Sequence, residues 1–232
     1  MDRRPPGLAW NRHDSAIWHT CDISTSALAG TLNERPLLSS PFPPQIAVDE
    51  QLLAQGPFEL LTFHAVGNGS YRRDGGTFFA TGRGGLAITA GVAAVRAAAN
   101  RRRRAAAATD AIPSWRLVDQ GTLWISTAGF YLETIRGLFP WGWGSVQSAQ
   151  LCSPASTLVH GTTDGGPVGW IIRSDWAELI FVLWAFCRHP SHPMLRHGAW
   201  LPPGWVERCN AAGFAPPASA LRLDRTRIGQ EN

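Results

Sequence analysis

The chain has 232 residues, of which 44% are hydrophobic and 16% charged, proportions that exclude an intrinsically disordered protein. All 21 basic residues are arginine, and against 17 acidic residues they leave a net charge of +4. The run Arg101–Arg104 supplies four of these charges, so the rest of the chain is neutral and a general polycation is excluded.

Four widely separated cysteines and the N-terminal composition indicate the compartment. The sequence has no Cys-x-x-Cys pair, and Met1–Gly7 leads into no apolar stretch of the signal-peptide type. We therefore expect reduced thiols and a cytoplasmic protein, of a bacterium with an Arg- and Ala-rich proteome or of its phage. The longest apolar run, Leu179–Cys187, is far shorter than the roughly 18 residues of a membrane span, which predicts a protein that is not transmembrane.

The first segment in chain order, residues 1–47, contains six prolines and is predicted to be an extended arm. Pro41–Pro44 is polyproline-like, and Trp10 and Trp18 are suited to fix the arm to the body. Asp49–Leu53 is expected to form one helical turn.

Residues 48–110 are predicted to be a strand–helix extension that packs on the following domain. Phe58–Val66 and Thr77–Thr81 have the composition of strands, and apolar residues recur at helical spacing from Leu86. We expect this helix to end among Asn100–Ala108.

Residues 111–190 change to the period-two alternation of strands. Six or seven short strands are predicted, separated by turns at Asp119–Gly121, Thr127–Gly129 and Asp164–Gly166. Because these connections are short, the sheet is expected to be antiparallel.

One helix, Asp175–Arg188, follows the strands and is apolar almost all round. Asp175 and Glu178 have the spacing of a capping box. Such a helix must be covered on more than one side. We expect the sheet on one side and either the helix from Leu86 or Trp200–Trp205 on the other, which would make 48–210 one cooperative unit. Residues 191–232 remain as a C-terminal segment and loose tail.

Gly121–Ser126, Gly129–Leu132, Pro140–Trp143 and the helix Asp175–Arg188 together resemble the PH-like superfold, especially bacterial GRAM-type domains, over residues of about 115–189. The resemblance implies an α+β fold, a small antiparallel β-barrel capped by a C-terminal helix. The two strands and the helix predicted within residues 48–110 would form an N-terminal strand–strand–helix extension to it. It implies a binding scaffold rather than an enzyme. Phosphoinositide-binding PH domains carry basic residues around the first hairpin loop, whereas Asp119–Gly121 is short and acidic, which weakens a lipid interpretation.

The sharpest electrostatic feature consists of four consecutive basic residues, Arg101, Arg102, Arg103 and Arg104. On a helix they point in all directions around the axis, so they form no single flat face. They are either a solvated helix end that favours the helix dipole, or a contact for an acidic protein, nucleic acid or anionic lipid.

Two further clusters were considered as sites. Trp141 and Trp143 alternate with glycine and are candidates for an exposed aromatic contact, with packing in the barrel as the alternative for at least one of them. Zinc-ligand residue types gather within eleven residues, but Pro190 and Pro193 interrupt them and the spacing fits no common zinc motif. We expect a capping role and no metal for this cluster, which comprises Cys187, His189, His192 and His197.

No catalytic motif is evident. Gly-x-Ser-x-Gly is absent, and Gly82–Gly85 is read as a plain turn because no Gly-Lys-Ser/Thr follows it. An enzyme would require a deep polar pocket that holds His64 or His160 beside a carboxylate. The sequence therefore predicts a non-enzymatic protein-interaction module without a cofactor, an adaptor or regulatory protein that binds a protein partner. The alternative is a peripheral anionic-lipid or nucleic-acid binder acting through Arg101–Arg104.

Overall fold

A computed structural model describes residues 10–36, 38–65, 99–108, 111–163 and 165–220. The chain divides into two compact units, one formed by Met1–Leu61 with Leu117–Asn232 and the other by Thr62–Arg116. This division differs from the single unit expected over residues 48–210. The described residues of the second unit, 62–65, 99–108 and 111–116, include no buried residue.

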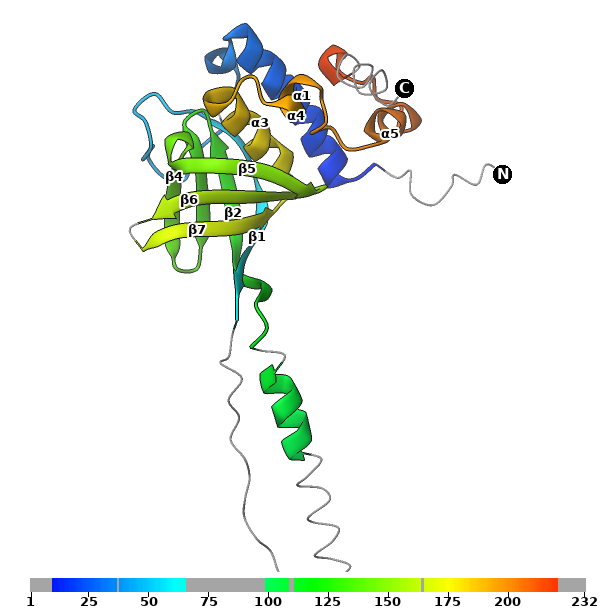
Figure 1. The fold of residues 1–232 in the computed structure, drawn as a ribbon. Helices are drawn as coiled ribbons and strands as arrows, with labels where there is room; N and C mark the ends of the chain where they lie inside the picture. The colour runs from blue at the N-terminus through cyan, green and yellow to red at the C-terminus, as the bar shows by residue number, and fades with distance from the viewer. Residues whose placement is uncertain (1–9, 37, 66–98, 109–110, 164, 221–232) are drawn as a thin grey trace, which may run out of the picture. The chain divides into compact units, whose positions relative to one another are not determined.

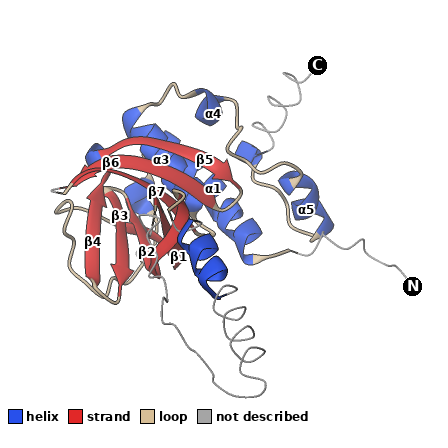
Figure 2. Cartoon of the chain, turned by 60° about the horizontal axis from the view of Figure 1, so that its bottom comes forward, coloured by secondary structure: helices blue, strands red, loops and turns tan. Residues whose placement is uncertain are grey.

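The described residues form an α+β fold with one seven-stranded antiparallel sheet, which confirms the α+β class and the antiparallel strands that were predicted. The order is β4-β3-β2-β1-β7-β6-β5, so β1 lies at the centre and β4 and β5 form two open edges. Strands β5 to β7 cross the direction of β2 to β4, and the sheet wraps around α3 (Figures 1 and 2). The strands are β1 (Leu52–His64), β2 (Ser114–Ser126), β3 (Gly129–Thr134), β4 (Gly137–Gly142), β5 (Val146–Ser153), β6 (Ser156–Thr163) and β7 (Gly166–Arg173).

Two of the three predicted turns are confirmed. Thr127 and Ala128 connect β2 to β3, and the β6–β7 hairpin closes with Thr163 opposite Gly166. The turn predicted at Asp119–Gly121 is wrong, because β2 continues through it. A Cβ atom at Gly121 would lie 1.9 Å from the carbonyl oxygen of Glu133 on β3, so this glycine permits close strand approach rather than a turn.

The N-terminal segment is not the extended arm that its prolines predict, because α1 (Arg12–Ala29) is an 18-residue helix. Asn11 and Asp14 form a capping box: Asp14 N donates to Asn11 Oδ1 at 2.8 Å and Asn11 N donates to Asp14 Oδ2 at 3.2 Å. Gly30, with φ of 72°, ends the helix in the left-handed conformation that favours glycine. All the prolines of the segment lie outside the helix.

A proline-containing stretch follows α1 and the 3₁₀ helix η1 (Leu32–Glu34), and it packs against residues of β2 and β3. Phe42 packs against Trp124 and Tyr131 with ring centroids 5.5 and 4.8 Å apart. The Tyr131 hydroxyl accepts a hydrogen bond from Gln45 N at 3.0 Å and donates one to the carboxylate of Glu50. The helical turn predicted at residues 49–53 is wrong, since β1 already begins at residue 52.

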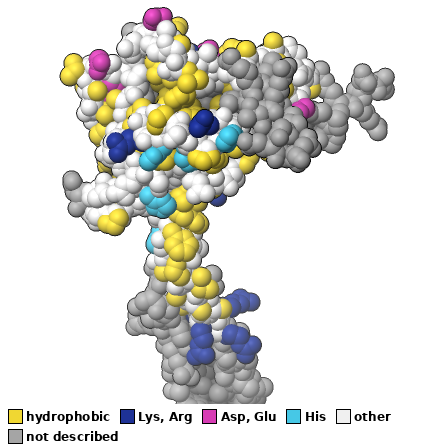
Figure 3. All heavy atoms as spheres, turned by 45° about the horizontal axis from the view of Figure 1, so that its top comes forward, with side chains coloured by type: hydrophobic (Ala, Val, Ile, Leu, Met, Phe, Trp, Pro, Cys, Tyr) yellow, Lys and Arg dark blue, Asp and Glu magenta, His cyan; other side chains and the backbone are white. Residues whose placement is uncertain are grey.

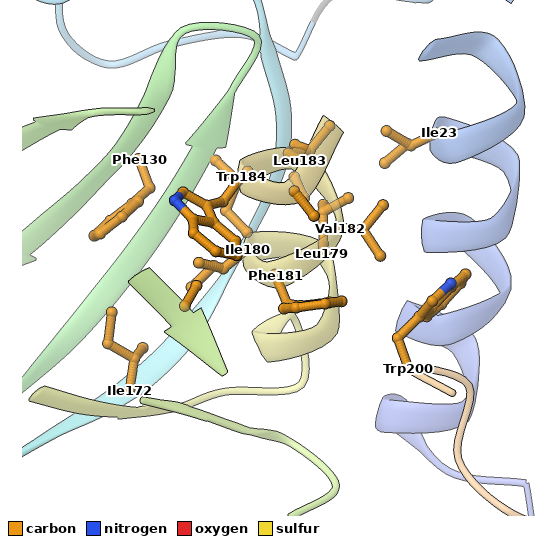
Figure 4. Close-up of a cluster of buried hydrophobic side chains, with 14 of the residues drawn as sticks. Ile23, Phe130, Ile172, Leu179, Ile180, Phe181, Val182, Leu183, Trp184 and Trp200 are labelled. Atoms are coloured by element: carbon orange, nitrogen blue, oxygen red, sulfur yellow. The ribbon is translucent and has the colours of Figure 1, made fainter. Parts of the chain in front are cut away.

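The predicted apolar helix is α3 (Ala177–Arg188), which packs against β5, β6 and α1. It lies between Phe130 and Ile172 of the sheet on one side and Ile23 of α1 with Trp200 on the other (Figure 4). The prediction that the sheet and the segment around Trp200 cover this helix is confirmed. The structure shows that α1 also covers it, which was not predicted. The helix from Leu86 lies outside the described residues in its first part and is helical over 99–108.

The C-terminal segment also contacts α1. It contains the helices α4 (Pro193–Arg196) and α5 (Trp205–Ala211). A second 3₁₀ helix, η2 (Trp143–Ser145), lies earlier in the chain, between β4 and β5. The buried Trp205 donates from Nε1 to Asp14 O at 3.1 Å, and Arg208 Nε donates to Asp14 Oδ1 at 2.9 Å. Residues 221–232 of the predicted tail, like the strand predicted at Thr77–Thr81 and the glycine turn at Gly82–Gly85, lie outside the described residues.

Among the residues that the structure describes, no helix combines the length and the apolar character required to cross a bilayer.

Candidate functional site

Trp141 and Trp143, expected as exposed aromatic contacts, are part of the hydrophobic core, with 6% and 4% of their surface exposed. Trp141 packs against Trp170 at 4.7 Å and lies parallel to Phe130 at 6.2 Å between ring centroids. Trp143 Nε1 donates to the carbonyl oxygen of Thr127 at 3.1 Å. Packing in the sheet, the alternative interpretation, therefore describes both residues, and neither is available as an exposed contact.

Arg101, Arg102, Arg103 and Arg104 lie on helix 99–108, and all four are exposed. Figure 3 shows the arginine side chains of this helix, in dark blue, reaching into solvent. Both interpretations of the run, a solvated helix end and a partner contact, predict exposed arginines, so their exposure does not distinguish the two.

The second unit also carries large apolar side chains at its surface. Phe63, Ile112 and Trp115 are 58%, 62% and 38% exposed, and the rings of Phe63 and Trp115 contact one another with centroids 5.5 Å apart. Residues 62–65, 99–108 and 111–116, which are the described part of this unit, include no buried residue. A basic helix and exposed aromatic residues thus occur in one unit, and the described residues of this unit form no buried core.

One member of the cluster considered for zinc, His192, caps a helix. His192 precedes α4 as its N-cap and accepts a hydrogen bond from Met194 N at Nδ1, 3.2 Å away. Burial, helped by the nearby His189, lowers the pKa of His192, which favours the neutral ring that such an acceptor requires. The ring of His189 packs on Trp184 at 4.9 Å. Among the described residues no group of three or more potential ligands could hold a metal ion, and this includes Cys187 and His197.

The two histidines considered for catalysis have local partners. His64 Nδ1 hydrogen-bonds to the hydroxyl of Thr62 at 2.8 Å, and His160 Nδ1 to that of Ser148 at 3.1 Å. No carboxylate is among the hydrogen-bond partners of either ring in the part of the chain that the structure describes. The arrangement that would indicate an enzyme is not formed by these residues.

A different histidine lies beside a buried carboxylate, and sequence reasoning missed it. Glu178, on the first turn of α3, is 1% exposed, and its Oε1 atom accepts hydrogen bonds from His13 Nε2 at 3.0 Å and Ala155 N at 2.9 Å. The capping box predicted for Asp175 and Glu178 is therefore wrong, because Glu178 points into the fold and the N-cap position has no side-chain hydrogen bond.

The charge state of this pair follows from its surroundings. Burial lowers the pKa of His13, but the hydrogen bond to Glu178 and the negative charges of Glu178, Asp175 and Asp14 outweigh burial, and the pKa is raised above 6.5. The pair is thus an ion pair over a wider pH range than a free histidine would allow.

Glu178 lines a cavity of about 180 Å³ that is bounded by residues 151–154, Met194 and residues 199–203, and it is the only charged residue among them. A second cavity, of about 740 Å³, is lined by residues 57–59, 120–121, 153–156 and 173–175. In the second cavity Arg173 pairs with Glu59 at 3.5 Å, and both side chains are about half exposed, so this pair is solvated.

The Glu178 cavity offers space for a ligand, but its described residues do not form the paired nucleophile and base of a nucleophilic catalytic site. No hydroxyl or thiol hydrogen-bonds to His13 within the described ranges, so no nucleophile is paired with a base there. The signal for this site in the sequence is a single carboxylate at the start of an otherwise apolar helix, which local spacing alone assigns to a cap.

No family model matches the chain, and comparison with curated proteins and with solved structures gives no match either.

Proposed function

We propose that this chain is a non-enzymatic protein-interaction module, an adaptor or regulatory protein built on a PH-like scaffold, and that the described residues of the unit Thr62–Arg116 take part in binding its partner. The observation that carries the proposal is that no described residue of this unit is buried, although Phe63, Ile112 and Trp115 are large and apolar. Exposed apolar side chains of this kind are typical of interaction sites.

The PH-like scaffold is supported by topology. Strands β1 to β4 and β5 to β7 each follow in chain order through the sheet, and one apolar helix, α3, comes directly after the last strand and packs on β5 and β6. The open edges at β4 and β5 depart from a closed barrel.

The chemistry of the unit points to an acidic protein partner. Arg101–Arg104 presents four positive charges on one exposed helix, and arginine and tryptophan are among the residues that contribute most to protein interfaces. A partner with a carboxylate-rich surface would pair with the arginines while it covers the exposed rings of Phe63 and Trp115. We place this activity in the cytoplasm, in keeping with four cysteines that form no disulfide in the described chain.

The same arginines favour a second candidate, a peripheral binder of anionic lipid or nucleic acid. Their arrangement around the helix suits a diffuse field of phosphates as well as carboxylates. Neutrality of the rest of the chain limits the number of phosphate contacts to about four, so such binding would be weak and would fall steeply with salt.

Affinity purification of the tagged full chain from its native cells, with nuclease treatment and a high-salt wash, separates the two candidates. A stoichiometric protein that survives the wash, and is then shown to bind the purified chain, supports the interaction module. Loss of all bound material at high salt, together with binding of the purified chain to anionic vesicles or nucleic acid, supports the second candidate.

A further inference from the structure

Glu178 presents one carboxylate oxygen that nothing in the described chain satisfies. Oε1 accepts two hydrogen bonds, from His13 and Ala155, whereas Oε2 is buried and has no hydrogen-bond partner. A buried acceptor without a donor costs free energy, and a charged one costs more. Glu178 is also one of the residues that line the adjacent cavity of about 180 Å³.

The walls of the cavity are poor in donors. Pro154, Pro202 and Pro203 have no N–H group, and the nearby hydroxyl of Ser153 donates to the carbonyl oxygen of Pro154. Most of the remaining wall is apolar, with Trp200 as its aromatic part. The site therefore combines one carboxylate with a wall of mostly apolar side chains.

We propose that this cavity binds a primary ammonium group on a short apolar stem, with Glu178 Oε2 as the acceptor and the apolar wall around the stem. The unsatisfied oxygen needs a hydrogen-bond donor, which a simple anion lacks, and the described residues offer no three-ligand group for a metal ion. A guanidinium group prefers both oxygens of a carboxylate, and Oε1 is already occupied. A compact ammonium needs only one oxygen, and aromatic and alkyl walls suit its stem.

The chain contains no lysine, so no side chain of its own can supply the ammonium. Two sources share this chemistry: a free alkylamine and a lysine side chain of a protein partner. The site lies apart from the arginine run in sequence and does not depend on the function proposed for Thr62–Arg116.

The test is calorimetric titration of the full chain with n-butylammonium and with n-butanol, which has a similar stem but no charge. A pair of short peptides that differ only in lysine against norleucine forms the second arm. We expect saturable binding of the ammonium compound at least tenfold tighter than that of its neutral counterpart. Tighter binding of the lysine peptide than of n-butylammonium would assign the site to a partner's lysine, and the reverse order to a free amine.

Three variants complete the experiment. Glu178→Gln removes the charge and should abolish the preference for ammonium. Because this variant also loses the ion pair with His13, Ala199→Trp is needed as well: Ala199 is an exposed wall residue, and the larger side chain should block the cavity while Glu178 stays intact. Glu59→Gln, in the other cavity, is the matched control and should bind as the wild type does. Absence of saturable ammonium binding, or equal binding by wild type and Ala199→Trp, would overturn the proposal.

Discussion

His13 on α1 and Glu178 on α3 are 165 residues apart in the chain and are joined by a 3.0 Å hydrogen bond between Nε2 and Oε1. The same oxygen accepts from Ala155 N in the turn between β5 and β6. One buried carboxylate thus connects the N-terminal helix, the central helix and the sheet. These hydrogen bonds link the N-terminal segment to other elements of the first compact unit, to which it belongs.

The His13–Glu178 pair predicts a specific pH dependence of stability. The pKa of His13 is raised in the folded chain, since the hydrogen bond and charge of Glu178, with Asp175 and Asp14, outweigh the opposing effect of burial. Folding therefore favours the protonated ring, and this stabilisation is complete below the ordinary value of 6.5 and is lost as pH rises through the raised pKa. Urea unfolding between about pH 6 and pH 8 should show a decline in the free energy of unfolding that His13→Gln removes.

The matched control is His160→Gln, because the ring of His160 bonds to a serine and to no described carboxylate. This variant should keep the wild-type slope of stability against pH. Equal slopes for the wild type and His13→Gln would contradict the prediction.

The ion pair of Asp14 and Arg208 should contribute far more than a surface pair. Asp14 is fully buried and Arg208 Nε lies 2.9 Å from its Oδ1 atom. Arg208→Ala leaves an uncompensated buried charge and should lower the free energy of unfolding by about 3 kcal/mol. Arg35→Ala, which breaks the more exposed pair with Asp22 at 2.8 Å, should cost about 1 kcal/mol or less. Equal losses in denaturant unfolding would mean that Asp14 is not held as described.

Two tryptophans of different exposure separate stability from binding. Trp141 is in the core, so Trp141→Ala should cost about 3–5 kcal/mol. Trp115 is 38% exposed in the second unit, so Trp115→Ala should change stability by no more than about 1 kcal/mol and should weaken partner binding instead. Unfolding curves and partner affinities of the two variants test this prediction. If Trp141→Ala weakened partner binding without loss of stability, Trp141 would be an exposed contact and the prediction would be contradicted.

Gly161 on β6 provides a test of the packing around Trp141. A Cβ atom there would lie 2.5 Å from the Trp141 ring and 2.7 Å from the carbonyl oxygen of Ser145. Gly161→Ala should therefore destabilise the fold by about 1–3 kcal/mol through overpacking. A Cβ atom at Gly144 would meet nothing within 4 Å, so Gly144→Ala should stay within about 0.5 kcal/mol of the wild type in thermal unfolding. Tolerance of both substitutions would contradict the placement of Trp141.

The elements that local pattern determines could be predicted from the sequence. Period-two alternation gave the antiparallel strands, and the apolar run at Leu179–Cys187 gave α3. The helix α1 was missed because proline-rich flanks outweighed the Asn11–Asp14 capping box, which was present in the sequence. The Gly121 position was misread because a glycine in a strand and a glycine in a turn have the same local signature.

The candidate sites were harder to predict because they depend on contacts between distant segments. Glu178 has capping-box spacing, and only the placement of His13 and Ala155 against it shows that it points inward. The Gly-flanked Trp141 and Trp143 have the composition of an exposed loop, and their burial follows from packing against Phe130 and other core rings. Exposure of the arginine run, by contrast, followed from its charge alone.

The central claim, that the described residues of Thr62–Arg116 take part in binding the partner, is tested most directly by the affinity of the purified partner for two variants of equal charge. One replaces Arg101, Arg102, Arg103 and Arg104 with glutamine. The other replaces four exposed arginines of the first unit, Arg136, Arg173, Arg188 and Arg196, in the same way. We predict that the first variant binds at least tenfold more weakly than the wild type and that the second binds nearly as well. Equal binding by the wild type and the first variant, or equal losses in both variants, would contradict the claim.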